Sequence, residues 1–299
     1  MSCIGSILAV LASTQSDPAS VFDYDSKAPL QIEERAVDIL GDVRVTNLSY
    51  ASPKGGRVPA YLVVPRGKGP FPAVVFAHMG GSDRTEFLSE ALGLARLGVV
   101  SIMIDAPYLR PDPPLALRDD HRGRAESDRD IYVCLVVDLR RAIDLLVARL
   151  DVDVSRIGYV GHSLGAAWGG VLTSIDLRIK TFVFMAGAAD PGKVTGDDPY
   201  SRLMQSVLGT DLTALEHYES MISTIAAHNF IGDARPGSIL FQLAHFDLKV
   251  SKERAEDYPK VAGPSHEVRW YFTGHDFHDE QATKDRREWL AKKLEFQLG

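Results

Sequence analysis

Hydrophobic positions along the chain fall into short apolar runs separated by stretches with helical spacing. The runs Ala73–Ala77 and Val99–Ile104 are almost continuously apolar, as expected of strands that are buried on both faces. Between them, Thr85–Leu97 carries apolar residues at the spacing of an amphipathic helix. Together these three segments predict a strand–helix–strand unit.

The same alternation continues to the C-terminus. Apolar residues at spacings of three and four predict a long helix over about Asp128–Leu150, one face of which packs on the sheet, and a final helix over about Asp279–Leu298. Four further strands are predicted at Arg156–Val160, Thr181–Met185, Ser238–Leu243 and Val268–Phe272. This order indicates an α/β fold with a mostly parallel central sheet and helices on both faces.

The N-terminal part of the chain has a different pattern. Val43–Tyr50 and Arg57–Val64 are β-rich runs on either side of a Pro/Gly-containing turn, which predicts an antiparallel hairpin at the edge of the sheet. We therefore predict a single domain over residues 41–299, preceded by an N-terminal extension over residues 1–40.

Two stretches interrupt the alternation of strands and helices. Ala106–Ala125 is rich in proline and charge, and we expect it to form a wall of the binding pocket. Pro191–Gly237 holds two helical patterns and no strand, and we expect a small helical lid insertion there, over about residues 191–237.

Composition narrows the classes of partner. The net charge is -7 and the pI is about 5.7, which argues against nucleic acid and anionic membrane surfaces as partners. No apolar run reaches the roughly 20 residues needed to span a bilayer, so no membrane span is expected. The apolar run Ile4–Ala12 has no Lys or Arg before it, so we expect a cytoplasmic location, with secretion by an N-terminal signal as the alternative. A homo-oligomer is compatible with the sequence.

The clearest chemical signal follows the predicted strand Arg156–Val160. That strand leads directly into Gly161-His162-Ser163-Leu164-Gly165, which small and apolar residues follow. This is a G-x-S-x-G motif in the strand–turn–helix context in which it forms a nucleophile elbow. Glycines flank the serine because its strained backbone leaves no room for neighbouring Cβ atoms. Ser163 is the predicted nucleophile.

Together with this elbow, the His78-Met79-Gly80-Gly81 segment and the late Asp247 and His275 carry a resemblance to a known superfamily. Over about Val43–Leu298 the chain resembles the α/β-hydrolases, and within them the dienelactone-hydrolase-like and acetyl-xylan-esterase-like esterases. Dienelactone hydrolases proper carry a cysteine in the elbow, whereas this chain has Ser163. The resemblance therefore implies an α/β-hydrolase fold and a serine esterase.

A serine hydroxyl needs a histidine base that is oriented by a carboxylate. In this fold the chain order is serine, acid, histidine. His275 and His278 both follow the last predicted strand, and Gly274-His275 resembles the family's catalytic histidine. We predict His275 as the base, with His278 as the alternative.

For the acid, the loop after the penultimate strand contains Asp247, at the position where the family usually has it. Asp190, which follows the strand Thr181–Met185, is the alternative acid, because only geometry can distinguish a triad.

The developing oxyanion needs two backbone N–H donors. One is predicted at Leu164, directly after the nucleophile. The second should come from the segment after the strand Ala73–Ala77, which resembles the H-G-G-G type segment of lipases and esterases. Met79 is the preferred donor there, and Gly80 is the alternative.

These residues together predict a carboxylic ester hydrolase that forms an acyl-enzyme on small-to-medium acyl esters, with a small-molecule substrate. No cofactor is expected. No metal is expected either, because the closely spaced His275, Asp276, His278 and Asp279 have no remote cluster to complete a metal site. Alternatives are peptide or thioester cleavage or acyl transfer on the same fold, and a catalytically silent binding protein.

Overall fold

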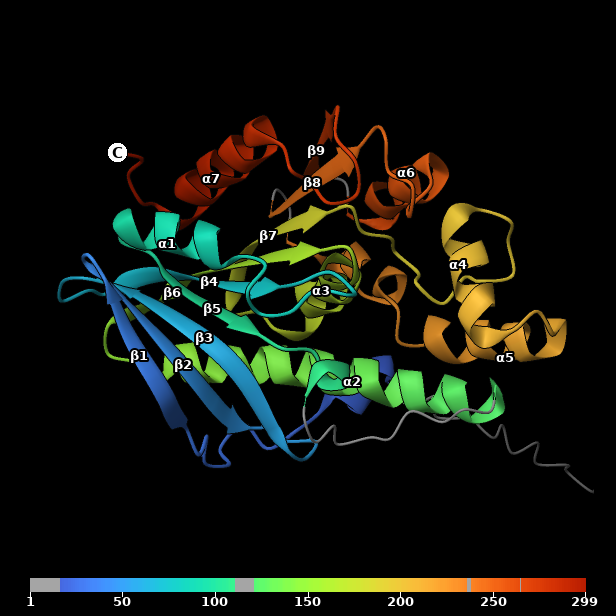
Figure 1. The fold of residues 1–299 in the computed structure, drawn as a ribbon, viewed down its shortest axis with the longest axis horizontal. Helices are drawn as coiled ribbons and strands as arrows, with labels where there is room; N and C mark the ends of the chain where they lie inside the picture. The colour runs from blue at the N-terminus through green and yellow to red at the C-terminus, as the bar shows by residue number, and fades with distance from the viewer. Residues whose placement is uncertain (1–16, 111–120, 236–237, 264) are drawn as a thin grey trace, which may run out of the picture.

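Figure 1 shows the computed structural model, which describes residues 17–110, 121–235, 238–263 and 265–299. The apolar run Ile4–Ala12 lies outside the described residues, as does the middle part of the predicted pocket wall, residues 111–120. None of the described helices is long and apolar enough to cross a membrane.

In the described part of the chain, nine strands form one sheet in the order β1-β2-β3-β5-β4-β6-β7-β8-β9. The pairs from β1 to β3, and β3 with β5, are antiparallel, whereas all pairs from β5 to β9 are parallel. The predicted mostly parallel sheet is confirmed. The strands are β1 (Glu33–Leu40), β2 (Val43–Ala51), β3 (Arg57–Pro65), β4 (Phe71–Ala77), β5 (Val100–Ile104), β6 (Val152–His162), β7 (Ile179–Met185), β8 (Ile239–Ala244) and β9 (His266–Tyr271).

Helices cover both faces of this sheet. The α-helices are α1 (Leu88–Arg96), α2 (His121–Val147), α3 (Leu164–Ile175), α4 (Pro199–Leu208), α5 (Leu212–Ser223), α6 (Lys252–Val261) and α7 (Glu280–Leu294). In Figure 1, α1 and α7 lie above the sheet, and α2 lies below it. Each face has its own apolar core, and β4 contributes alternate residues to both: Val75 to the core that α2 and α3 share, and Val74 and Phe76 to the core under α1 and α7.

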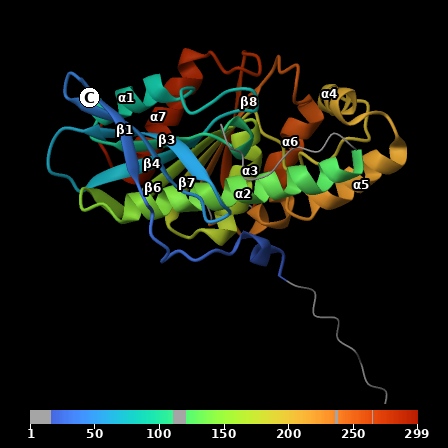
Figure 2. The same ribbon diagram turned by 60° about the horizontal axis from the view of Figure 1, so that its bottom comes forward.

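The beginning of the fold differs from the prediction in two respects. The hairpin β2–β3 is not the edge of the sheet, because β1 pairs with the outer side of β2. The predicted domain boundary at residue 41 is therefore too late, since β1 belongs to the sheet and the preceding Phe22 is fully buried against the core. Figure 2 shows the short helix η1 (Pro18–Phe22) beside α2. All residues of β1 are exposed, so the strand has no alternation of buried and exposed positions that a sequence pattern could reveal.

The predicted helical insertion contains α4 and α5, which lie together at one end of the sheet (Figure 1). Helix α5 packs against α2, and the hydroxyl of Tyr218 in α5 donates a hydrogen bond of 3.1 Å to Asp128 in α2. The insertion is thus attached to the main body of the domain through buried contacts.

A fully buried ion pair connects α2 to the chain that follows β5. Arg110 Nη2 lies 2.5 Å from Asp138 Oδ2, and the two side chains are 1% and 0% exposed. The thiol of Cys134 also donates to Asp138 Oδ2, at 3.3 Å. Removing one partner of such a pair is costly because the other charge stays buried without compensation.

We expect Asp138→Ala to lower the free energy of unfolding by about 3–5 kcal/mol, because the Arg110 guanidinium would remain buried and unpaired. Urea unfolding monitored by circular dichroism measures the change. The matched control is Asp42→Ala, which removes the 2.8 Å pair with Arg66 whose side chains are 73% and 80% exposed, and which should cost at most about 1 kcal/mol. Equal losses in the two variants would contradict the expectation.

Candidate active site

Ser163 occupies a sharp turn between β6 and α3. Its backbone has φ 51° and ψ −106°, a conformation that side-chain-bearing residues rarely adopt. A Cβ on Gly161 would lie 2.4 Å from the Gly165 carbonyl oxygen, and a Cβ on Gly165 would lie 2.2 Å from the Ala77 carbonyl oxygen. Both positions therefore require glycine. The Ser163 N–H donates to the Met185 carbonyl at 2.7 Å, which attaches the turn to β7.

His275 brings a ring nitrogen to the serine. It lies in the loop between β9 and α7, and its Nε2 is 2.9 Å from Ser163 Oγ. The other candidate, His278, is exposed and lines a different cavity. The structure therefore pairs Ser163 with His275.

Asp247 lies on the far side of the His275 ring. Its Oδ1 and Oδ2 are 2.9 and 2.8 Å from His275 Nδ1. The backbone N–H groups of Lys249 and Val250 donate to Asp247 Oδ1, both at 2.8 Å, and so hold the carboxylate in place. With Nδ1–H donating to Asp247, Nε2 is free to accept the serine proton.

Asp190, the alternative acid, has other partners. Its Oδ2 accepts from the hydroxyl of Ser223 in α5 at 2.9 Å, and its Oδ1 accepts from the Gly192 N–H at 2.8 Å. These bonds hold the loop after β7 against α5, so Asp190 is not the carboxylate that meets His275.

The preference for Met79 over Gly80 as second oxyanion donor does not hold in this structure. The Met79 N–H donates to Glu86 Oε2 at 2.9 Å, so it is already paired. Gly80 lines the same cavity as Ser163 and Leu164. Leu164 is the first residue of α3, where backbone N–H groups have no partner within the helix. The sequence motif could not reveal the difference, because Glu86 reaches Met79 only after the chain folds back.

Ser163 and His275 open into a cavity of about 500 Å³. Helix α4 supplies one apolar wall with Leu203, Met204 and Val207, and α2 supplies another with Ile131 and Tyr132. The ring of Tyr132 stacks on that of Trp168, with centroids 4.4 Å apart, so Trp168 supports the wall from behind. The predicted insertion thus contributes to the site.

Polar side chains interrupt this apolar lining, among them Tyr108, Arg124 and Asp128. The hydroxyl of Tyr108 is buried and has no hydrogen-bond partner within the described residues, and burial raises the pKa of this phenol well above its usual value. Asp128 pairs with Arg124 at 2.9 Å. Burial raises the pKa of the Asp128 carboxyl, and the hydrogen bond from Arg124 opposes that rise. Tyr108 and Arg124 belong to the stretch Ala106–Ala125 that the sequence predicts as a wall of the pocket, and both line the cavity. The sequence did not predict Asp128 as a lining residue, because no motif marks it.

No group of three or more His, Cys, Asp or Glu side chains in the described ranges is arranged to hold a metal ion. The loop of His275, Asp276, His278 and Asp279 is included in that finding.

Comparison with known proteins assigns the family. A family model described as acetyl xylan esterase (AXE1) matches residues 24–186, more than half of the 299 residues. The match includes the elbow and the segment after β4, whereas Asp247 and His275 lie beyond it. The Bacillus subtilis (strain 168) protein titled "Putative hydrolase YtaP" is 27% identical over 183 residues, which cover 56% of this chain and 61% of that protein.

Two solved structures share the fold along almost the whole chain. The acetyl xylan esterase from Paenibacillus sp. R4 has a TM-score of 0.77 at 18% identity, with 92% of each chain covered. Acetyl xylan esterase 1 from Thermoanaerobacterium sp. JW/SL YS485 has a TM-score of 0.74 at 14% identity, with 91% of each chain covered. The fold is thus that of the α/β hydrolases, and the family match over more than half of its length means that the chain belongs to the acetyl xylan esterase (AXE1) family.

Proposed function

We propose that the protein is a carboxylic ester hydrolase of the serine type, in which Ser163, His275 and Asp247 form the catalytic triad. The observation that carries this proposal is the continuous hydrogen-bonded row from Ser163 Oγ through His275 to Asp247, with distances of 2.9 and 2.8 Å. Its first member, Ser163, lies in a strained turn and lines an apolar cavity. Membership of the acetyl xylan esterase family supports the same reaction class.

In the proposed mechanism, His275 Nε2 takes the Ser163 proton as Oγ attacks the ester carbonyl carbon. The resulting imidazolium is stabilised by Asp247, which lies against Nδ1. Collapse of the tetrahedral intermediate breaks the bond to the alcohol oxygen, which takes the proton from Nε2 and leaves an acyl-Ser163 ester. Water, deprotonated by His275 in turn, then hydrolyses that acyl-enzyme.

For the oxyanion we propose the backbone N–H groups of Leu164 and Gly80 as donors. Both residues line the cavity next to Ser163, and the Leu164 amide lies at the positive N-terminal end of α3. The Glu86 carboxylate that accepts the Met79 amide makes Gly80 the better second donor.

The cavity supports small-to-medium acyl esters as substrates. Its volume of about 500 Å³ and its apolar walls of α2 and α4 residues can accommodate an acyl group of several carbons. The acetyl xylan esterases that share the fold and the family are named for acetyl esters, whose acyl group lies at the small end of this range. We propose that the acyl chain lies along Leu203, Met204 and Val207.

Ser163→Ala should lower kcat for p-nitrophenyl butyrate by about 10⁶-fold, to the background rate, because the acyl-enzyme can no longer form. The wild type should show a burst of p-nitrophenol and incorporate a serine-directed phosphonate at Ser163, located by peptide mass. Turnover that survives in the variant would exclude Ser163 as the nucleophile. A folded wild type with neither turnover nor label would favour the silent binding protein, and amide and thioester analogues of the same acyl group test the other chemistries.

Asp247→Asn should lower kcat by about 10⁴-fold, because an amide facing Nδ1 favours the wrong imidazole tautomer. Asp190→Asn is the matched control, since its carboxylate contacts Ser223 and Gly192 and not His275. It should change kcat less than about threefold. If the larger loss occurred in the Asp190 variant, the assignment of the acid would be wrong.

Met204→Trp should reduce kcat/KM for octanoyl esters about tenfold or more relative to acetyl esters, because the larger side chain fills the acyl side of the cavity. Ser206→Trp on the same helix is the control. Ser206 is exposed and does not line the cavity, so the preference for chain length should stay as in the wild type. An unchanged preference in Met204→Trp would place the acyl chain elsewhere.

A further inference from the structure

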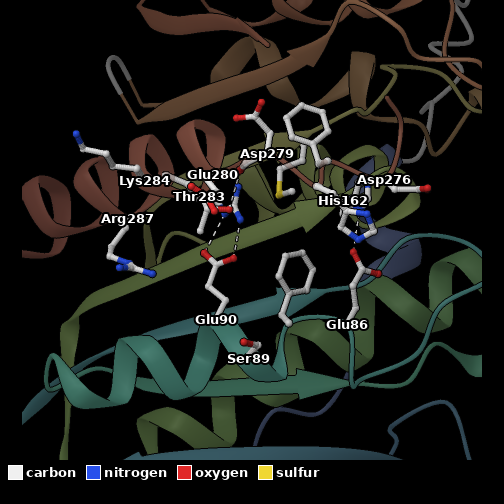
Figure 3. Close-up of a pocket in the computed structure, with 15 residues that line it drawn as sticks. Glu86, Ser89, Glu90, His162, Asp276, Asp279, Glu280, Thr283, Lys284 and Arg287 are labelled. Atoms are coloured by element: carbon white, nitrogen blue, oxygen red, sulfur yellow. Dashed lines mark hydrogen bonds and ion pairs between the residues drawn. The ribbon is translucent and has the colours of Figure 1, made fainter. Parts of the chain in front are cut away.

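A second cavity lies behind the loop that carries His275. It has a volume of roughly 700 Å³, and its lining differs from that of the cavity in front of Ser163. Figure 3 shows its charged side chains, with Glu90 and Arg287 toward one side and the ring of His162 above Glu86 on the other. The Glu86–His162 pair takes no part in the proton transfers of the proposed mechanism.

Three hydrogen bonds make this pair a link between two loops of the active site. His162 Nε2 lies 2.7 Å from the backbone carbonyl oxygen of His275, and His162 Nδ1 lies 2.6 Å from Glu86 Oε1. Glu86 Oε2 accepts the Met79 N–H at 2.9 Å. A continuous path thus runs from the backbone of the base to the backbone of the segment that precedes Gly80.

The path also contacts the nucleophile turn, because His162 is the residue before Ser163. Its side chain is 2% exposed, and its ring centroid lies 5.5 Å from that of His275. A single buried side chain on the elbow therefore reaches the loop of the base directly and the oxyanion segment through Glu86.

The acceptor atoms around His162 indicate which of its ring nitrogens carries a hydrogen. A carbonyl oxygen can only accept, so Nε2 carries a hydrogen. Burial raises the pKa of the Glu86 carboxyl, but the hydrogen bonds from His162 and the Met79 amide outweigh burial, so the pKa lies below its usual value. Glu86 is then a carboxylate, and its Oε1 faces Nδ1 of His162 at 2.6 Å. The two ring nitrogens of His162 thus face oxygen atoms from two different loops.

We propose that Glu86 and His162 are positioning residues that hold the His275 loop and the His78–Gly81 segment in register with Ser163. The rate depends steeply on the relative positions of base, nucleophile and oxyanion donors, since a displacement of about 1 Å can lower it about 100-fold. The inference rests on the proposed function, because it concerns the rate of that reaction.

Comparing a conservative with a disruptive substitution at Glu86 separates the contribution of its hydrogen bonds from that of its charge. In Glu86→Gln the amide oxygen can accept the Met79 N–H, and the amide nitrogen can donate to Nδ1 of His162, whose Nε2–H can still donate to His275. All three links remain while the charge of the carboxylate disappears. Glu86→Ala removes the path to Met79 and leaves His162 without its second acceptor.

The test measures kcat and KM for p-nitrophenyl butyrate in the wild type, Glu86→Ala, Glu86→Gln and His162→Asn, with active sites counted by phosphonate titration. We expect Glu86→Ala and His162→Asn to lower kcat per active site about 10- to 100-fold, with KM changed less than about threefold. Glu86→Gln should restore kcat to within about threefold of the wild type. The double variant Glu86→Ala/His162→Asn should show a kcat no lower than that of the less active single variant, because the two residues act as one unit.

Glu90→Ala is the matched control. Glu90 lines the same cavity and forms a 2.6 Å ion pair with Arg286, so its loss disturbs a buried pair of the same cavity without touching the link. Its thermal stability should fall while kcat per active site stays at the wild-type value. A kcat of Glu86→Ala equal to the wild type, or an equal loss in Glu86→Gln, would overturn the proposal. An inactive, unlabelled wild type would instead contradict the proposed function.

Discussion

The close approach of backbone to backbone at the Ser163 turn is the constraint on which the rest of the site depends. The end of β6, the start of α3 and the end of β4 meet there at distances that leave no space for a Cβ on Gly161 or Gly165. Because α3 starts at this point, its first residue, Leu164, and the serine before it line the same cavity. A side chain at either glycine would separate the helix from the sheet and move both groups.

The parallel sheet gathers the remaining groups at the same edge. Strands β4, β6, β8 and β9 all end there, so the loops that follow them bring together residues as far apart as Ser163 and His275. Ligand sites at the carboxyl ends of parallel strands are a general property of such sheets. In this chain the α4–α5 insertion adds an apolar wall over that edge, and its attachment to α2 through Tyr218 and Asp128 keeps the wall in place.

The loop of His275 has two different surroundings. In front of it lie Ser163 and an apolar cavity, and behind it lie the Glu86–His162 pair and a cavity lined by charged side chains. A buried polar pair contributes little net stability compared with apolar packing, which favours orientation as the contribution of this pair. The same residue, Glu86, accepts a hydrogen bond from the Met79 amide, which is why Met79 is not among the proposed oxyanion donors.

By itself the sequence determined the mostly parallel sheet, most of its strands, the nucleophile turn and the candidates for the base and the acid. These rest on short-range patterns: apolar runs, helical spacing, and glycines beside a serine between a strand and a helix. Strand β1 was not predicted, because its residues are all exposed and show no alternation of buried and exposed positions. Only the tertiary structure showed which candidates meet: His275 and not His278 lies beside Ser163, and Asp247 and not Asp190 lies beside His275. It also showed that the Met79 amide is paired with Glu86. Each of these findings depends on a contact that chain folding, and no local pattern, brings within hydrogen-bond distance.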